Sequence, residues 1–134
     1  MNPYQKYKNQ SVESMSQGEL LIMVYDEAIK DMKRAGMALD DKDYDEYEKQ
    51  LNYFTKIIRY LVNTLDLNQP ISMELRRIYD YIQFDVGRLL AGRERRKDEI
   101  PQIIEIISNL RDGFEEASRR STATHFIQEN TVVV

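Results

Sequence analysis

The chain contains no cysteine and no tryptophan, and His125 is the single histidine among its 134 residues. Without cysteine, it has no disulfide scaffold, thiol nucleophile or thiolate metal site. One histidine does not supply the Glu-x-x-His pairs of a di-iron helical bundle, and the sequence has no Gly-x-Ser-x-Gly turn for a serine nucleophile. We therefore predict a protein that is not an enzyme and uses no metal or cofactor, with His125 solvated in a C-terminal tail.

Charge and hydropathy exclude further classes. The formal net charge is −4 and the basic residues are dispersed, which argues against a nucleic-acid partner. No apolar run approaches the ~20 residues that cross a bilayer, and the first eight residues lack the apolar centre of a signal peptide. We therefore expect a cytoplasmic protein without direct membrane insertion.

Two charged segments resemble binding motifs. Asp41, Asp43 and Asp45 alternate as in a calcium loop, but Glu46 and Asn52 stand where such a loop requires glycine and glutamate. We predict a solvated connection whose acids favour the start of the next helix. The basic run 93–97 suits an exposed turn after a helix C-terminus, with docking to an acidic or nucleic-acid partner as the alternative.

Three prolines and five glycines are few for a β-rich protein, and the apolar residues recur at helical spacing. We predict four helices, over about 17–39, from Asp43 to the break at 68–70, from near Ser72 to Gly92, and from near Asp98 to about Arg120. Asp43 is a good N-cap, and Pro101 falls in a first turn, where its missing N–H is harmless. The apolar stripes are Leu20, Leu21, Val24, Ala28, Met32, Ala35 and Leu39; Tyr47, Leu51, Phe54, Ile58, Leu61 and Leu65; Leu75, Ile78, Tyr79, Ile82, Val86, Leu89 and Leu90; and Ile100, Ile103, Ile104, Ile107, Leu110, Phe114 and Ala117.

Short connections between four amphipathic helices predict an all-α fold, an antiparallel four-helix bundle with an extended N-terminal arm and a flexible C-terminal tail. The predicted parts are an arm over 1–15, the bundle over 16–119 and the tail over 120–134. Ser16 and Glu19 form a capping box at the start of the first helix. That helix is also apolar beyond one face, through Ile22, Met23, Tyr25 and Ile29, which indicates a second surface to cover.

Five motifs, in order along the chain, resemble the FliS family of flagellar export chaperones. They are Asn2-Pro3-Tyr4 with Tyr7, the segment Ser16–Ile29, Leu61-x-x-x-Leu65-Asp66, Leu75-x-x-Ile78-Tyr79-Asp80-Tyr81, and Leu110-Arg111-Asp112-Gly113-Phe114. The chain departs from the family pattern with Gln17 for proline, Glu27 for glycine, Phe114 for tryptophan, and a basic run in place of a more neutral turn at 93–97.

The resemblance implies a helical bundle that binds the disordered C-terminal segment of flagellin, prevents its premature polymerisation and docks at the flagellar type III export gate. A helix-in-groove mode coupled to folding of the guest fits that role. The predicted groove residues, some of which can instead belong to the core, are Leu21, Val24, Tyr25, Ile29, Leu61, Leu75, Tyr79 and Tyr81. The residues predicted to fold back over the empty groove are Tyr4, Tyr7, Val12 and Met15.

The alternative is a self-associating or adaptor bundle without chaperone activity. A tight homodimer would favour that alternative, whereas the chaperone interpretation expects a monomer or a weak homodimer.

Overall fold

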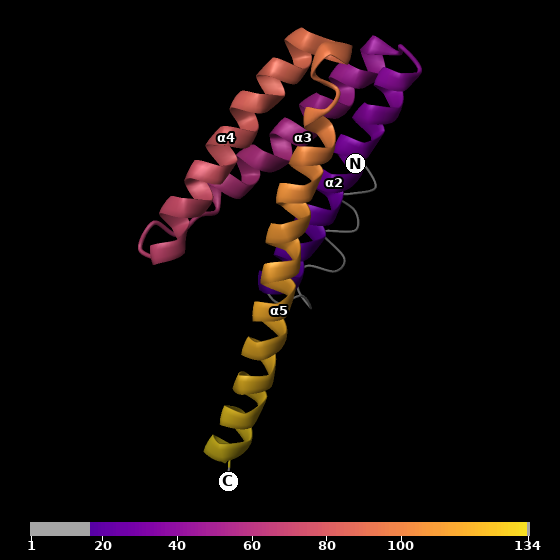
Figure 1. Ribbon diagram of the computed structural model, residues 1–134. Coiled ribbons are helices and arrows are strands. Elements are labelled where there is room, and N and C mark those ends of the chain that lie inside the picture. The colour runs from indigo at the N-terminus through magenta and orange to yellow at the C-terminus, as the bar shows by residue number, and fades with distance from the viewer. Residues whose placement is uncertain (1–16, 134) are drawn as a thin grey trace. The chain divides into compact units, whose positions relative to one another are not determined.

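The computed structural model describes residues 17–133, and side chains over 17–120 (Figure 1). The helices are α2 (Gln17–Asp40), α3 (Tyr44–Asn63), α4 (Pro70–Gly92) and α5 (Glu99–Val133), with a 3-10 turn, η2 (Arg93–Arg96), before α5. No strand occurs within residues 17–133. The predicted all-α, four-helix fold is therefore confirmed, while the arm residues Tyr4, Tyr7, Val12 and Met15, and Ser16 of the capping box, lie outside the described residues.

Local sequence explains where α3 and α4 begin. The Asp43 side chain accepts a hydrogen bond from the Glu46 N–H at 3.2 Å, which confirms the predicted N-cap. α4 begins at Pro70, two residues before the predicted start, because proline is well suited to the first helical position, where no N–H is needed. The connection before Pro70 is organised by Asp66, whose backbone oxygen accepts the Ser72 hydroxyl at 2.5 Å.

The residues fall into two compact units, and the larger one comprises Glu27–Ile107. Within it, α3 and α4 pack side by side (Figure 1). The Tyr47 hydroxyl, near the start of α3, donates to the Leu89 carbonyl oxygen, near the end of α4, at 2.9 Å. The two helices are therefore antiparallel. Apart from Ala38, the buried apolar side chains of this unit belong to the predicted stripes. They are Ala28, Met32, Ala35, Ala38, Leu39, Tyr47, Leu51, Phe54, Ile58, Leu61, Leu75, Tyr79, Ile82, Val86, Leu89, Ile100, Ile103 and Ile107.

The smaller unit joins α2 up to Asp26 with α5 from Ser108 onward. The helices approach closely at Gly18, where an added Cβ would lie 2.5 Å from Ser118 Oγ and 2.8 Å from Ser118 Cβ. Glycine at this position is therefore required by its neighbour on α5 rather than by its own backbone conformation.

Two helix ends differ from simple expectation. α4 ends at Gly92 as predicted, but the left-handed backbone falls on the next residue, Arg93, with φ 52°. The sequence also predicts that the last helix ends near Arg120, where the apolar period is lost. That prediction is wrong for the backbone, which stays helical to Val133. Residues 121–133 contain no proline or glycine, so nothing in them breaks a helix.

Candidate functional site

The predicted groove residues do not share one surface. Leu21 and Ile29 are half-buried, and Tyr81 is exposed. The other five are at most 6% exposed and belong to the buried interior: Val24, Tyr25, Leu61, Leu75 and Tyr79. A bound segment could contact these five side chains only if the residues that cover them were displaced. Their assignment to a binding groove therefore stays a prediction.

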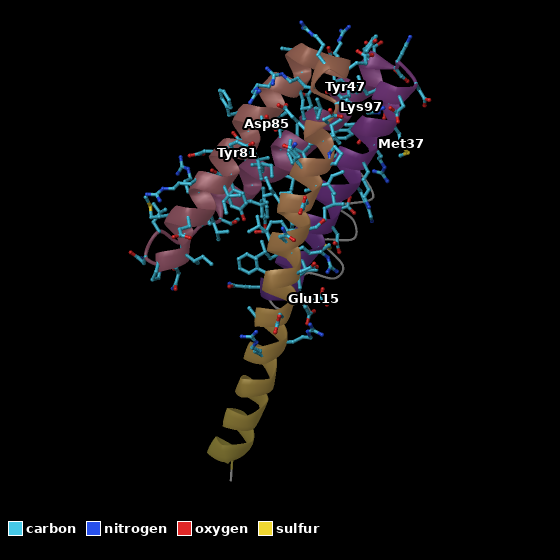
Figure 2. All side chains as sticks on the ribbon, viewed as in Figure 1. Met37, Tyr47, Tyr81, Asp85, Lys97 and Glu115 are labelled. Carbon is cyan, nitrogen blue, oxygen red and sulfur yellow. The ribbon has the colours of Figure 1, made fainter. Side chains whose placement is uncertain are left out.

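An exposed apolar stripe instead runs along the outside of α4. Met73, Tyr81 and Phe84 are 54%, 50% and 66% exposed, and Arg77 and Arg88 lie on the same side of the helix. Successive members are three or four residues apart, so they lie one above another on a single helical face. We call Met73, Arg77, Tyr81, Phe84 and Arg88 the outer stripe. Figure 2 shows Tyr81 on α4, with Asp85 one turn further along.

More apolar surface lies where α3 connects to α4. Leu67 is 65% exposed and Ile71 55%. The turn that carries them is held by Asp66, whose side chain accepts the Asn68 N–H at 3.0 Å and whose backbone oxygen accepts the Gln69 N–H at 2.9 Å. Exposed apolar side chains thus begin in this connection and continue into the first turn of α4. Grouping of several such side chains is typical of a surface that binds a partner.

Among these residues, only Tyr81 was predicted from the sequence. Leu67, Ile71, Met73 and Phe84 were not predicted, because they lie outside the apolar stripes that build the core. The signal was nevertheless present, since Met73 and Phe84 are large apolar residues on the polar side of an otherwise amphipathic helix.

A smaller aromatic site lies on α3. Tyr53 is 42% exposed, and the Lys49 and Lys56 ammonium groups lie 5.8 and 5.9 Å from its ring centre. These contacts fall within the range of cation–π attraction. Because two lysine side chains of the same helix lie near the Tyr53 ring, this site offers less free apolar surface than the outer stripe.

Two of the sequence motifs meet in the smaller unit. The rings of Tyr25 and Phe114 are 5.9 Å apart with an interplanar angle of 33°. Beside them, Arg111 Nε lies 2.6 Å from Asp26 Oδ1, and Arg111 also pairs with Glu115. The aromatic ring at position 114 therefore packs against Tyr25.

The basic run at 93–97 is largely engaged within the chain. The Arg93 guanidinium lies 4.0 Å from the Tyr44 ring centre, and the Tyr44 hydroxyl donates to Glu94 Oε1 at 2.5 Å. This hydrogen bond raises the pKa of Tyr44 and lowers that of Glu94. Lys97 pairs with Asp40 at the end of α2. These contacts support the turn interpretation for most of the run.

The part of the chain that the structure describes shows no group of three or more His, Cys, Asp or Glu side chains that could hold a metal ion. His125 lies outside the described side chains. No helix within the described residues is long and apolar enough to cross a membrane.

The fold and the outer stripe place the protein in the class of all-helical bundles with an exposed apolar face. The family described as "Flagellar protein FliS" matches residues 1–121. The chain therefore belongs to the FliS family of flagellar secretion chaperones.

Two known proteins illustrate the relationship. The flagellar secretion chaperone FliS of Bacillus subtilis (strain 168) is 27% identical over 118 residues, which cover 87% of this chain and 86% of that protein. A solved structure, the crystal structure of a flagellar chaperone from bacteria, superposes with a TM-score of 0.73 at 19% identity. The superposition covers 87% of this chain and 95% of that one, so the fold is shared along nearly its whole length.

Proposed function

We propose that this protein binds the C-terminal segment of flagellin in the cytoplasm, prevents its premature polymerisation and delivers it to the flagellar export gate. The observation that carries the proposal is the outer stripe, together with Leu67 and Ile71. It offers apolar side chains on a rigid helix, and such a face suits an amphipathic guest that folds as it binds. Membership of a family of flagellar secretion chaperones supports flagellin as the guest.

The proposal keeps the predicted arm. Tyr4, Tyr7, Val12 and Met15 would cover the apolar surface proposed to bind flagellin when no flagellin is present, and would leave it when flagellin binds. Covering an apolar surface lowers the risk of aggregation. Deleting residues 1–15 should then change the affinity for flagellin while the bundle stays folded. An unchanged affinity would contradict a role for the arm.

The test of the function is calorimetric titration with the last ~50 residues of flagellin from the same organism. We expect saturable one-to-one binding with a strongly negative heat-capacity change, because apolar burial and ordering of the guest both contribute to that signature. A folded protein that does not bind the segment would overturn the proposal. Light scattering on the same sample addresses the alternative, since a tight homodimer that ignores flagellin would favour a self-associating bundle.

Matched alanine variants locate the surface. We expect Tyr81→Ala and Phe84→Ala each to weaken binding about tenfold or more, as central aromatic anchors do, with little change in melting temperature. Tyr53→Ala is the control, because Tyr53 is similarly exposed but lies on α3. Equal effects of all three variants would mean that the guest does not follow the outer stripe.

A further inference from the structure

A pocket lies at the C-terminal end of α4. Its volume is about 390 Å³, and it is lined by Arg88, Ala91 and Gly92 of α4 and by Arg95 and Arg96 of η2. Three of the five lining residues are arginines. A guanidinium group presents N–H donors in a planar fork that matches the two oxygens of a carboxylate.

The acidic side chains that pair with the pocket's arginines are fewer than the arginines themselves. Glu99 Oε1 lies 3.1 Å from Arg96 Nη1 and 3.2 Å from Arg88 Nη2, so one carboxylate serves two arginines. Asp85 Oδ1 lies 3.7 Å from Arg88 Nη1, and its burial, followed by the charge of Glu99, raises its pKa. The ion pairs of Glu99 and Asp85 thus involve Arg88 and Arg96 and leave out the third lining arginine, Arg95.

Arg95 is the arginine without a carboxylate. Its Nε lies 3.5 Å from the Gly92 carbonyl oxygen, and no ion pair joins it to an acid within residues 17–120. The side chain is exposed. Arg95 is therefore available to an anionic group that enters the pocket.

The pocket continues the outer stripe. The Arg88 guanidinium lies 6.0 Å from the Phe84 ring centre and also lines the pocket. Ala91 is seven residues beyond Phe84, which is two helical turns on the same side of α4. A segment lying along Met73, Tyr81 and Phe84 thus reaches the pocket without changing direction.

We propose that this pocket is a carboxylate-binding subsite, and that the segment bound along the outer stripe carries an acidic side chain or a terminal carboxylate at the end that meets Arg95. An acidic amphipathic peptide satisfies both halves of the surface, the apolar stripe and the guanidinium groups. A nucleic acid would use only the second half and would meet a chain of net charge −4. That flagellin supplies the segment rests on the proposed function; the chemistry of the subsite does not.

The experiment uses two synthetic helical peptides with the same leucine stripe and an amidated C-terminus, one ending in a Glu-Glu pair and the other in Gln-Gln. At low salt, we expect the full-length protein to bind the glutamate peptide about tenfold more tightly, because charge-assisted hydrogen bonds are the stronger ones. Arg95→Gln should abolish this preference. Arg59→Gln removes the same charge from an exposed position on α3 and should leave the preference intact.

Equal affinity for the two peptides, or a preference that survives in Arg95→Gln, would overturn the subsite. Binding of duplex DNA that depends steeply on salt and is lost in Arg95→Gln would overturn it as well, by assigning the pocket to nucleic acid. If the glutamate preference holds but the flagellin segment does not bind, the subsite stands and the proposed function fails. If the flagellin segment binds and Arg95→Gln alters neither its affinity nor the peptide preference, the subsite fails alone.

Discussion

Arg111 Nε donates to Asp26 Oδ1 at 2.6 Å across 85 positions of sequence, and this contact lies beside the Tyr25–Phe114 ring pair. Asp26 and Arg111 are partly exposed, so their ion pair adds little stability by itself. Its value is positional. The pair places the start of α2 and the middle of α5 in one register, with the aromatic contact as the main apolar component.

Tyr25 distinguishes a core role from a groove role. Its side chain is fully buried, so we expect Tyr25→Ala to lower the free energy of unfolding by about 3–5 kcal/mol, as loss of a buried aromatic does. Urea denaturation measures the change, with the exposed Tyr81→Ala as the control. A Tyr25→Ala protein of unchanged stability that no longer binds flagellin would instead support the groove assignment made from sequence.

Gly18 tests the close approach of α2 and α5 in the smaller unit. We expect Gly18→Ala to destabilise the protein by about 1–3 kcal/mol, because the new methyl group meets both side-chain atoms of Ser118. Gly113→Ala is the matched control on α5: nothing lies within 4 Å of its added Cβ, and alanine favours a helix by up to about 1 kcal/mol. Adding Ser118→Gly should restore much of the stability lost in Gly18→Ala. Additive losses in this double variant would contradict a direct clash.

Tyr47 tests the antiparallel pairing of α3 and α4. Its hydroxyl shares the Leu89 carbonyl oxygen with the Arg93 N–H. Tyr47→Phe should cost about 0.5–1.5 kcal/mol, the usual net value of one hydrogen bond, since the carbonyl keeps its backbone partner. Thermal denaturation followed by circular dichroism measures the loss, and the exposed Tyr53→Phe should show none. An equal loss in both variants would mean that the hydroxyl of Tyr47 has no special role.

Asp31 should make stability depend on pH. The residue is 6% exposed, and burial, followed by the charge of Glu27, raises its pKa to about 6 from an ordinary value of 3.8. The folded protein then holds this proton more tightly than the unfolded chain does, so the contribution of Asp31 to stability is lost as pH rises from about 4 to 6.

The variant Asp31→Asn stays neutral throughout. It should flatten the pH dependence in this window and raise the stability at pH 7 by about 1–3 kcal/mol, an estimate that follows from 1.4 kcal/mol for each unit of pKa. Melting temperatures between pH 4 and pH 7 provide the measurement, with the exposed Asp41→Asn as a control for the loss of charge. Arg34 Nη1 lies 3.8 Å from Asp31 Oδ1. A steeper fall in stability for Asp31→Asn than for the parent protein would show that this ion pair outweighs the burial of Asp31.

The local features of the fold were predictable from sequence. Asp43 caps α3 as expected because the capping interaction involves only neighbouring residues. The stripe positions from Tyr47 to Leu61 are buried because helical periodicity determines which residues share a face.

The proposed binding surface was less predictable, because helical periodicity does not say which neighbouring element covers a given face. The sequence predicted Tyr25 as a groove residue, but its ring packs against Phe114. No local sequence pattern indicates a contact between residues so far apart in the chain. Conversely, Phe84 is 66% exposed, because within the described part of the larger unit no helix covers the outer side of α4. The predicted end of α5, near Arg120, was too early. Loss of the apolar period indicates that a helix no longer packs on a neighbour, but the backbone hydrogen bonds of the helix can continue without that packing.

The long sequence separation between Asp26 and Arg111 also bears on the order of folding. The α3–α4 hairpin closes through a short connection, whereas the smaller unit has to bring together residues 85 positions apart and pay a larger loop-closure entropy. During synthesis, the first turns of α2 therefore leave the ribosome long before α5 exists to pack against them. We expect the α3–α4 hairpin to form early and the smaller unit to close last, so that the contacts of the smaller unit mainly slow unfolding rather than speed folding.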